Sequence, residues 1–165
     1  MYALEVAKTG LKMNELPPDP DFDLERQGAD NMTMTIQGNG GVYDLGKGAY
    51  FAVDDKGFHC RKLSMRTLAK AIRPFMDRPV VDMTNLKGAY DFELPVTPED
   101  RIGMMLRSAI NAGVNLPPQA LKALDSATDD SFTDALQKQG LVLVPQKAPL
   151  EVIVVDALQR TPTEN

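Results

Sequence analysis

Short segments of alternating apolar and polar residues recur along this chain, and most are followed within two residues by glycine, proline or aspartate. Alternation with a period of two is typical of strands that bury one face. In the first hundred residues it predicts strands over 2–8, 32–36, 50–53, 58–63 and 90–94. With 165 residues, 43% of them hydrophobic, the chain can bury a core without a disulfide or a metal.

Helical periodicity interrupts these strands after residue 63. Ser64 is a good N-cap, and the apolar residues Met65, Leu68 and Ile72 follow it at helical spacing. Proline at positions 74 and 79 ends this helix, and residues 79–82 are then a short strand. The order is therefore strand, helix, strand, strand.

The second half of the chain begins with helices. Residues 98–127 are predicted to form two of them, separated near Gly113, and the first carries one apolar stripe: Ile102, Met105, Leu106, Ala109 and Ile110. Asp129 or Asp130, together with Ser131, caps a further helix that ends at Gly140. Two strands follow, at 141–144 and 150–158, and the second contains a continuous apolar run typical of the middle of a sheet.

A helix followed by two strands thus occurs twice, at 64–94 and 131–158. This order favours an α+β fold, with a mainly antiparallel sheet and helices on one face, over a doubly wound parallel sheet. It is compatible with two strand–helix–strand–strand repeats. We predict a single domain over residues 1–165, which can be divided into two packed halves, 1–97 and 98–165.

The charge of the chain argues against several partners. The net charge is −5, and no cluster of lysine and arginine offsets it, so we expect no nucleic-acid binding. The apolar runs are too short for a transmembrane segment, and Met1 does not open a signal peptide. Cys60 is the only cysteine, which excludes a disulfide within the chain.

No group of residues forms a recognisable catalytic or metal-binding motif. His59 and Cys60 are neighbours in a predicted strand, where their side chains point to opposite faces and cannot activate one another. Asp19, Asp21 and Asp23 have the spacing of the first calcium ligands of an EF-hand, but the glycine and the final glutamate of that loop are missing. We therefore expect no cofactor and no bound metal.

The segment from Arg78 to Phe92 has the sequence RPVVDMTNLKGAYDF. It resembles the signature R-P-V-V-D-x-T-x-L-x-G-x-Y-D-F of a large family of uncharacterised proteins that is expanded in soil acidobacteria. Residues 2–11 and the closing segments 132–136, 140–147 and 150–156 are similar to the same family.

The resemblance implies a domain of unknown function that is exported, and so a place outside the cytoplasm, in the periplasm or secreted. It supplies no catalytic residues. Residues 98–127 depart from many relatives, in which this stretch is rich in proline and glycine. The helix-then-two-strands units more loosely resemble small periplasmic modules of secretins and TonB-dependent receptors.

Each residue of the signature also has a structural role in the predicted fold. Val80 and Val81 fill the core, Asp82 caps the next turn through Thr84 or Asn85, and Gly88 provides a positive φ between two antiparallel strands. We take six signature residues as structural first and as candidate site residues second: Arg78, Asp82, Thr84, Gly88, Tyr90 and Asp91.

These observations favour a non-enzymatic binding or interaction module of the cell envelope, whose partner is a protein or a small ligand. One alternative is a hydrolase-type enzyme with a site made of carboxylates, with Asp82, Asp91 and Tyr90 as its members. Another is a calcium-dependent surface protein that uses the acidic loop at residues 19–23.

Overall fold

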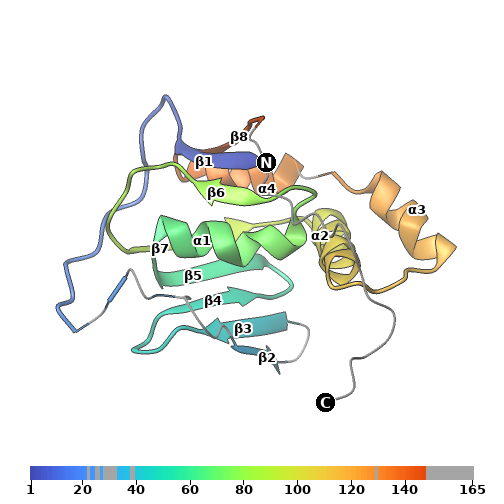
Figure 1. The fold of residues 1–165 in the computed structure, drawn as a ribbon, viewed down its shortest axis with the longest axis horizontal. Helices are drawn as coiled ribbons and strands as arrows, with labels where there is room; N and C mark the ends of the chain where they lie inside the picture. The colour runs from blue at the N-terminus through green and yellow to red at the C-terminus, as the bar shows by residue number, and fades with distance from the viewer. Residues whose placement is uncertain (22, 25–26, 28–32, 38–39, 129, 148–165) are drawn as a thin grey trace, which may run out of the picture.

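The computed structural model describes residues 1–21, 23–24, 27, 33–37, 40–128 and 130–147. Within them, the larger of two sheets is antiparallel throughout and has the order β2-β3-β4-β5-β7 (Figure 1). Its strands are β2 (Thr33–Gln37), β3 (Gly40–Asp44), β4 (Tyr50–Val53), β5 (Gly57–Leu63) and β7 (Tyr90–Pro95).

The smaller sheet has the order β6-β1-β8. Its middle strand, β1 (Tyr2–Val6), runs parallel to β6 (Val80–Asp82) and antiparallel to β8 (Leu141–Pro145). Neighbouring residues of β1 are both fully buried, Ala3 and Leu4, so this strand is covered on both faces rather than on one. Together the strands and helices confirm the predicted α+β class.

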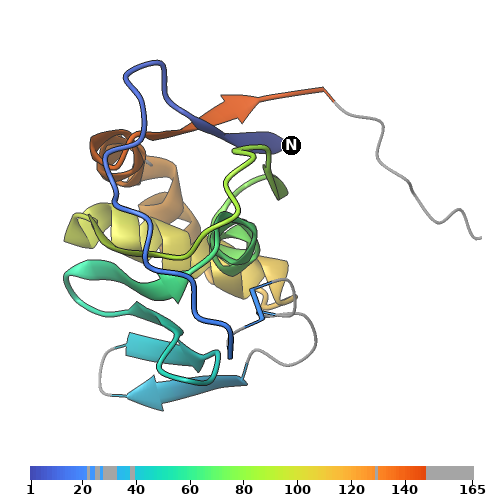
Figure 2. The ribbon, with the colours of Figure 1, turned by 90° about the vertical axis from the view of Figure 1, so that its left-hand side faces the viewer.

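Helices α1 (Met65–Ile72) and α4 (Asp130–Lys138) cover the same face of the larger sheet. The ring of Phe58 on β5 lies 5.5 Å from that of Phe75, in the 3₁₀ turn after α1, and 5.4 Å from that of Phe132 on α4. Because one side chain contacts both, the helices share a face, as predicted. Figure 2 shows α1 (green) between the smaller sheet and strands β2 and β3, and α4 (red-orange) beside the smaller sheet.

The predicted start of α1 is confirmed, and α4 starts at Asp130, within the predicted cap. The Ser64 hydroxyl accepts a hydrogen bond from the Thr67 amide at 3.2 Å, as an N-cap does. Helix α4 begins at Asp130, and the Ser131 hydroxyl instead donates to the buried carboxylate of Asp100 at 2.6 Å. Burial raises the pKa of Asp100, but hydrogen bonds from Ser131 and Thr128 outweigh burial and lower it.

Helices α2 (Pro98–Asn111) and α3 (Pro118–Ser126) lie to one side of the sheets (Figure 1). The predicted apolar stripe of α2 faces the core only in part, since Met105 packs against it whereas Ile102 is 49% exposed and Ile110 is 41% exposed. The buried residues of this helix are Asp100, Gly103 and Met104. The carboxylate of Asp100 accepts hydrogen bonds from Ser131 at the start of α4, so a polar contact as well as the apolar stripe holds this helix.

Two further predictions are wrong, and two are not tested by the described residues. Val81 is 42% exposed, because it points away from the core on a strand whose neighbour Val80 is buried. Strands β6 and β7 belong to different sheets and do not form a hairpin. The predicted core positions Val152 and Val154 lie outside the described residues. The division into halves stays a prediction.

In the part of the chain that the structure describes, every helix is too short or too polar to span a bilayer.

Candidate functional site

A long connection leads from β1 across the edge of the larger sheet, and we call its described residues, 7–21 and 23–24, the strap (blue in Figures 1 and 2). Three backbone hydrogen bonds fix it to the body: the Ala7 amide donates to the Gly140 carbonyl at 2.8 Å, the Lys12 amide to the Gln139 carbonyl at 2.9 Å, and the Leu16 amide to the Ala89 carbonyl at 2.8 Å. Two prolines, Pro17 and Pro18, then stiffen its course.

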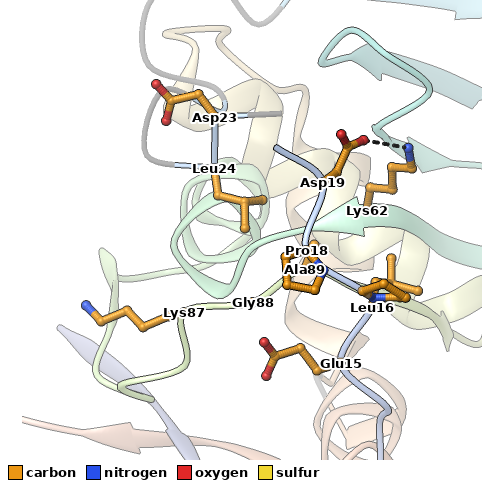
Figure 3. A pocket seen from close by; sticks show the side chains of 11 residues that line it. Glu15, Leu16, Pro18, Asp19, Asp23, Leu24, Lys62, Lys87, Gly88 and Ala89 are labelled. Atoms are coloured by element: carbon orange, nitrogen blue, oxygen red, sulfur yellow. Dashed lines mark ion pairs between the residues drawn. The ribbon is translucent and has the colours of Figure 1, made fainter. Parts of the chain in front are cut away.

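A cleft of about 350 Å³ lies between the strap and the end of the signature loop, residues 83–89 (Figure 3). Its volume is at the lower end of the range for small-molecule sites, roughly 300–1,000 Å³. The lining residues come from three segments that are far apart in the sequence: Glu15, Leu16, Pro17, Pro18, Asp19, Asp23, Leu24, Lys62, Lys87, Gly88 and Ala89.

Two signature residues place Glu15 in this cleft. The Tyr90 hydroxyl donates a hydrogen bond to Glu15 Oε2 at 3.3 Å. A Cβ on Gly88 would lie 2.3 Å from the Cγ and Cδ atoms of Glu15, so the side chain of Glu15 occupies the space that a larger residue at 88 would fill. Burial, together with the charge and hydrogen bond of Glu15, raises the pKa of Tyr90, which keeps the hydroxyl protonated as a donor.

A third signature residue, Asp91, supports the part of β5 that forms the opposite wall of the cleft. Strand β5 is irregular between Cys60 and Leu63, and Lys62 has a φ of 47°. The carboxylate of Asp91 accepts a hydrogen bond from the Lys62 amide at 2.7 Å and thereby holds this bulge. The ammonium group of Lys62 lies 3.6 Å from the carboxylate of Asp19 on the strap.

The buried side chain of Gln27 holds the same bulge. Its amide nitrogen donates to the Lys62 carbonyl at 2.7 Å, and its amide oxygen accepts from the Ser64 amide at 2.8 Å. Both groups of one buried amide are therefore paired, and the entry to α1 is tied to the wall of the cleft.

Asp82 and Thr84 shape the loop that leads to the cleft. Asp82 Oδ1 accepts from the Thr84 amide at 2.9 Å and from the Thr84 hydroxyl at 2.7 Å, which confirms the predicted cap. The positive φ expected at Gly88 is found instead at Asn85, with φ 60°. Asparagine tolerates this conformation. Gly88 is needed for a different reason, because a side chain there would collide with Glu15.

Replacing Asp82 with alanine removes the acceptor of both Thr84 hydrogen bonds. We expect Asp82→Ala to lower the free energy of unfolding by about 1–2 kcal/mol, since the loop is partly buried. Urea denaturation should show a lower midpoint with an unchanged m-value. Asp82→Asn retains an acceptor and should lose less. An alanine variant as stable as the parent would contradict this structural role.

Gly88→Ala should also destabilise the domain, by about 1 kcal/mol, because Glu15 must swing away and lose its bond to the Tyr90 hydroxyl. The double-mutant cycle with Glu15→Ala identifies the cause. In the Glu15→Ala background, the Gly88→Ala change should cost much less. An equal cost in both backgrounds would mean that the backbone at residue 88, and not the contact with Glu15, demands glycine.

Arg78, the remaining signature candidate, lies away from the cleft. Its guanidinium group is 5.7 Å from the centroid of the Tyr2 ring and also pairs with Asp77. Gly88 thus lines the cleft, Tyr90 and Asp91 hydrogen-bond to the lining residues Glu15 and Lys62, Asp82 and Thr84 shape the adjoining loop, and Arg78 lies outside.

The other face of the larger sheet, which we call the uncovered face because no helix of the described residues lies on it, carries the single histidine of the sequence. His59 Nε2 lies 2.9 Å from Asp54 Oδ2, and His59 Nδ1 lies 3.3 Å from Glu93 Oε1. Burial raises the pKa of Asp54, but hydrogen bonds from the Lys56 amide and from His59 outweigh burial and lower it. The adjacent Cys60 is buried on the other face, where desolvation raises the pKa of its thiol, so the two side chains do not meet.

The carboxylates of the enzyme alternative are not brought together. Asp82 belongs to the smaller sheet, while the Asp91 side chain is exposed and the neighbouring Tyr90 is buried. Among the described residues, no three histidine, cysteine, aspartate or glutamate side chains could hold a metal ion together. In the acidic loop, Asp19 pairs with Lys62 and caps the Asp21 amide.

Sequence reasoning did not find the cleft residues Glu15, Lys62 and Lys87, nor Gln27 behind the bulge. The proline-rich stretch at 16–20 was the available signal, since such a segment is extended and stiff and can form a fixed wall. Its partner across the cleft depends on how two distant segments pack, which local patterns do not contain.

The fold and the cleft define an α+β domain with two sheets, in which the strap and the signature loop leave a space of ligand size between them. Over residues 1–158, the chain matches the family described as "Protein of unknown function (DUF3738)". It therefore belongs to the DUF3738 family. No curated protein and no solved structure is significantly similar to it.

Proposed function

We propose that this domain is a non-enzymatic binding module of the cell envelope and that the cleft beneath the strap is its ligand site. One observation carries the proposal: three residues of the signature fix two residues that line the cleft. Gly88 and Tyr90 contact Glu15, and Asp91 accepts a hydrogen bond from the Lys62 amide. Their contacts position Glu15 and Lys62 before any ligand arrives. Such preorganisation lowers the entropic cost of binding.

The arrangement favours binding over catalysis. Tyr90 is committed to Glu15, and Asp91 to the backbone of Lys62. The groups that remain accessible in the cleft are charged side chains beside the apolar residues Leu16, Pro18 and Leu24, which are the usual lining of a recognition site.

Isotope-labelled protein, titrated with small fragments of positive, negative and zero charge, tests the site. We expect amide shifts concentrated at Leu16, Lys62 and Ala89. Ala89→Trp fills the cleft and should abolish the shifts. Ala52→Trp, on the uncovered face near His59, is the matched control and should preserve them. The reverse result would overturn the proposal and place binding on the uncovered sheet face.

The envelope location rests on the resemblance of the signature to an exported family. Fractionation of the native cells, followed by immunodetection, tests it. Recovery with periplasmic or secreted proteins supports the proposal, and recovery with cytosolic proteins overturns it.

A further inference from the structure

The charges that line the cleft are unequally compensated. Lys62 is paired with Asp19 at 3.6 Å, so these two charges largely cancel. Among the described residues, Glu15 has a single hydrogen-bonding partner, the Tyr90 hydroxyl, which is neutral. Glu15 is an exposed residue, and one hydrogen bond leaves its carboxylate with further acceptor positions.

Lys87 is the other lysine that lines the cleft, and it precedes Gly88, against which Glu15 lies. In Figure 3 its side chain extends outward along the rim, whereas Glu15 lies next to Gly88. An anion in the cleft would meet Glu15 at close range, whereas a cation there would gain a charge-assisted hydrogen bond. The polar part of the site therefore selects for positive charge.

The remaining walls select for a compact apolar body. Leu16, Pro17, Pro18, Leu24 and Ala89 line the cleft. The prolines of the strap have little conformational freedom, so an apolar group can pack against them without ordering a mobile surface. The cleft volume of about 350 Å³ is sufficient for a ligand with one aromatic ring.

We propose that the cleft binds an organic cation, a primary amine carried on a compact apolar group, with the ammonium donating to Glu15. This inference rests on the proposed function, because it names the ligand class of the same cleft. The apolar group packs against Pro18 and Leu24. The positive charge of Lys87 on the rim weakly repels the ligand.

Two probes with the same ring and opposite charge test the ligand class: 2-phenylethylammonium and 3-phenylpropionate. Each is titrated into the labelled protein at neutral pH and low salt, and amide shifts give the Kd. We expect the amine to bind and the acid to bind at least about ten-fold more weakly. Raising the salt concentration should weaken amine binding, because Glu15 is accessible to solvent.

Two variants assign the charge. Glu15→Gln keeps an acceptor for the Tyr90 hydroxyl and should leave the melting temperature unchanged, but it should weaken amine binding by about five- to ten-fold. Lys87→Gln removes a charge of the opposite sign from the same cleft and should lower the Kd for the amine, because it removes a repulsion.

Each other result overturns the inference in a distinct way. Tighter binding of the acid, or a Glu15→Gln Kd within about two-fold of the parent value, refutes the amine while leaving the cleft as a binding site. Binding of the amine with shifts at His59 instead of Ala89 refutes the location. If fragments of every charge leave the cleft amides unmoved, both the inference and the proposed function fail.

Discussion

Gly140→Ala should lower the free energy of unfolding by about 3 kcal/mol or more, which is a large part of the roughly 5–15 kcal/mol typical of a domain. Gly140 follows α4 and has a φ of 81°, a conformation that costs an alanine about 1 kcal/mol. A Cβ there would also lie 2.2 Å from the Gly10 carbonyl oxygen and 2.7 Å from the Leu11 Cα. These are backbone atoms of the strap, so no rotamer change relieves the contact.

The strap must therefore move away from α4. Two hydrogen bonds would be strained or lost, from the Ala7 amide to the Gly140 carbonyl at 2.8 Å and from the Lys12 amide to the Gln139 carbonyl at 2.9 Å. Each is worth about 1 kcal/mol. Because the same strap forms one wall of the cleft, hydrogen exchange should speed up along residues 10–16, and ligand binding in the cleft should weaken.

Gly113→Ala is the matched control for this prediction. Gly113 follows α2 with a φ of 83°, and a Cβ added to it would meet no atom of the described residues within 4 Å. Its replacement carries only the conformational cost, about 1 kcal/mol. Urea denaturation of both variants gives the comparison. If Gly140→Ala costs no more than Gly113→Ala, then the contact between α4 and the strap does not hold the strap in place.

Local sequence patterns predicted the elements whose stability is local. The cap at Ser64, the turn of Asp82 with Thr84, and the alternation of Tyr90 with Phe92 depend on residues within a few positions, and the structure confirms them. The shared face of α1 and α4 also followed from their apolar positions. Whether the signature residues also serve a binding site stays a prediction.

Long-range partners account for the errors. Gly88 was assigned a positive φ because glycine in a turn is usually explained that way, but its role depends on Glu15, far earlier in the chain. In α2 the buried carboxylate of Asp100 accepts hydrogen bonds from Ser131 and Thr128, while Ile102 and Ile110 of the apolar stripe are exposed. Periodicity describes one element at a time, and in these cases a distant element decided the outcome.

The cleft also depends on contacts between segments that are distant in the sequence. Its walls are the strap, the signature loop and the bulge of β5, and no two of them are adjacent in the sequence. Pattern reasoning supplied Gly88, Tyr90 and Asp91 as candidates, but their convergence requires the bulge at Lys62 and the crossing of the strap over β7. Both features follow from tertiary packing. Sequence patterns could therefore identify three residues near the cleft but could not show that a cleft forms there.

Phe58→Ala should have the largest effect on stability, about 3–5 kcal/mol, as is usual when a buried phenylalanine is truncated. Phe58 is 2% exposed, and its ring lies 5.4 Å from Phe51 on the neighbouring strand as well as close to Phe75 and Phe132. Edge-to-face and stacked pairs add about 0.5–1.5 kcal/mol each beyond the area they bury. One truncation therefore removes contacts to the sheet, to the turn after α1 and to α4 together.

The neighbour on the same strand provides the control, because His59 points to the uncovered face. His59→Ala changes a ring-bearing side chain whose partners, Asp54 and Glu93, are on the surface, and it should cost less than about 1 kcal/mol. Thermal and urea unfolding of the two variants should differ widely. Phe58→Leu, which keeps most of the volume, should fall between them. A Phe58→Ala variant nearly as stable as His59→Ala would show that α1 and α4 are held to the sheet by other contacts, and that the shared aromatic cluster is not what joins the two helices.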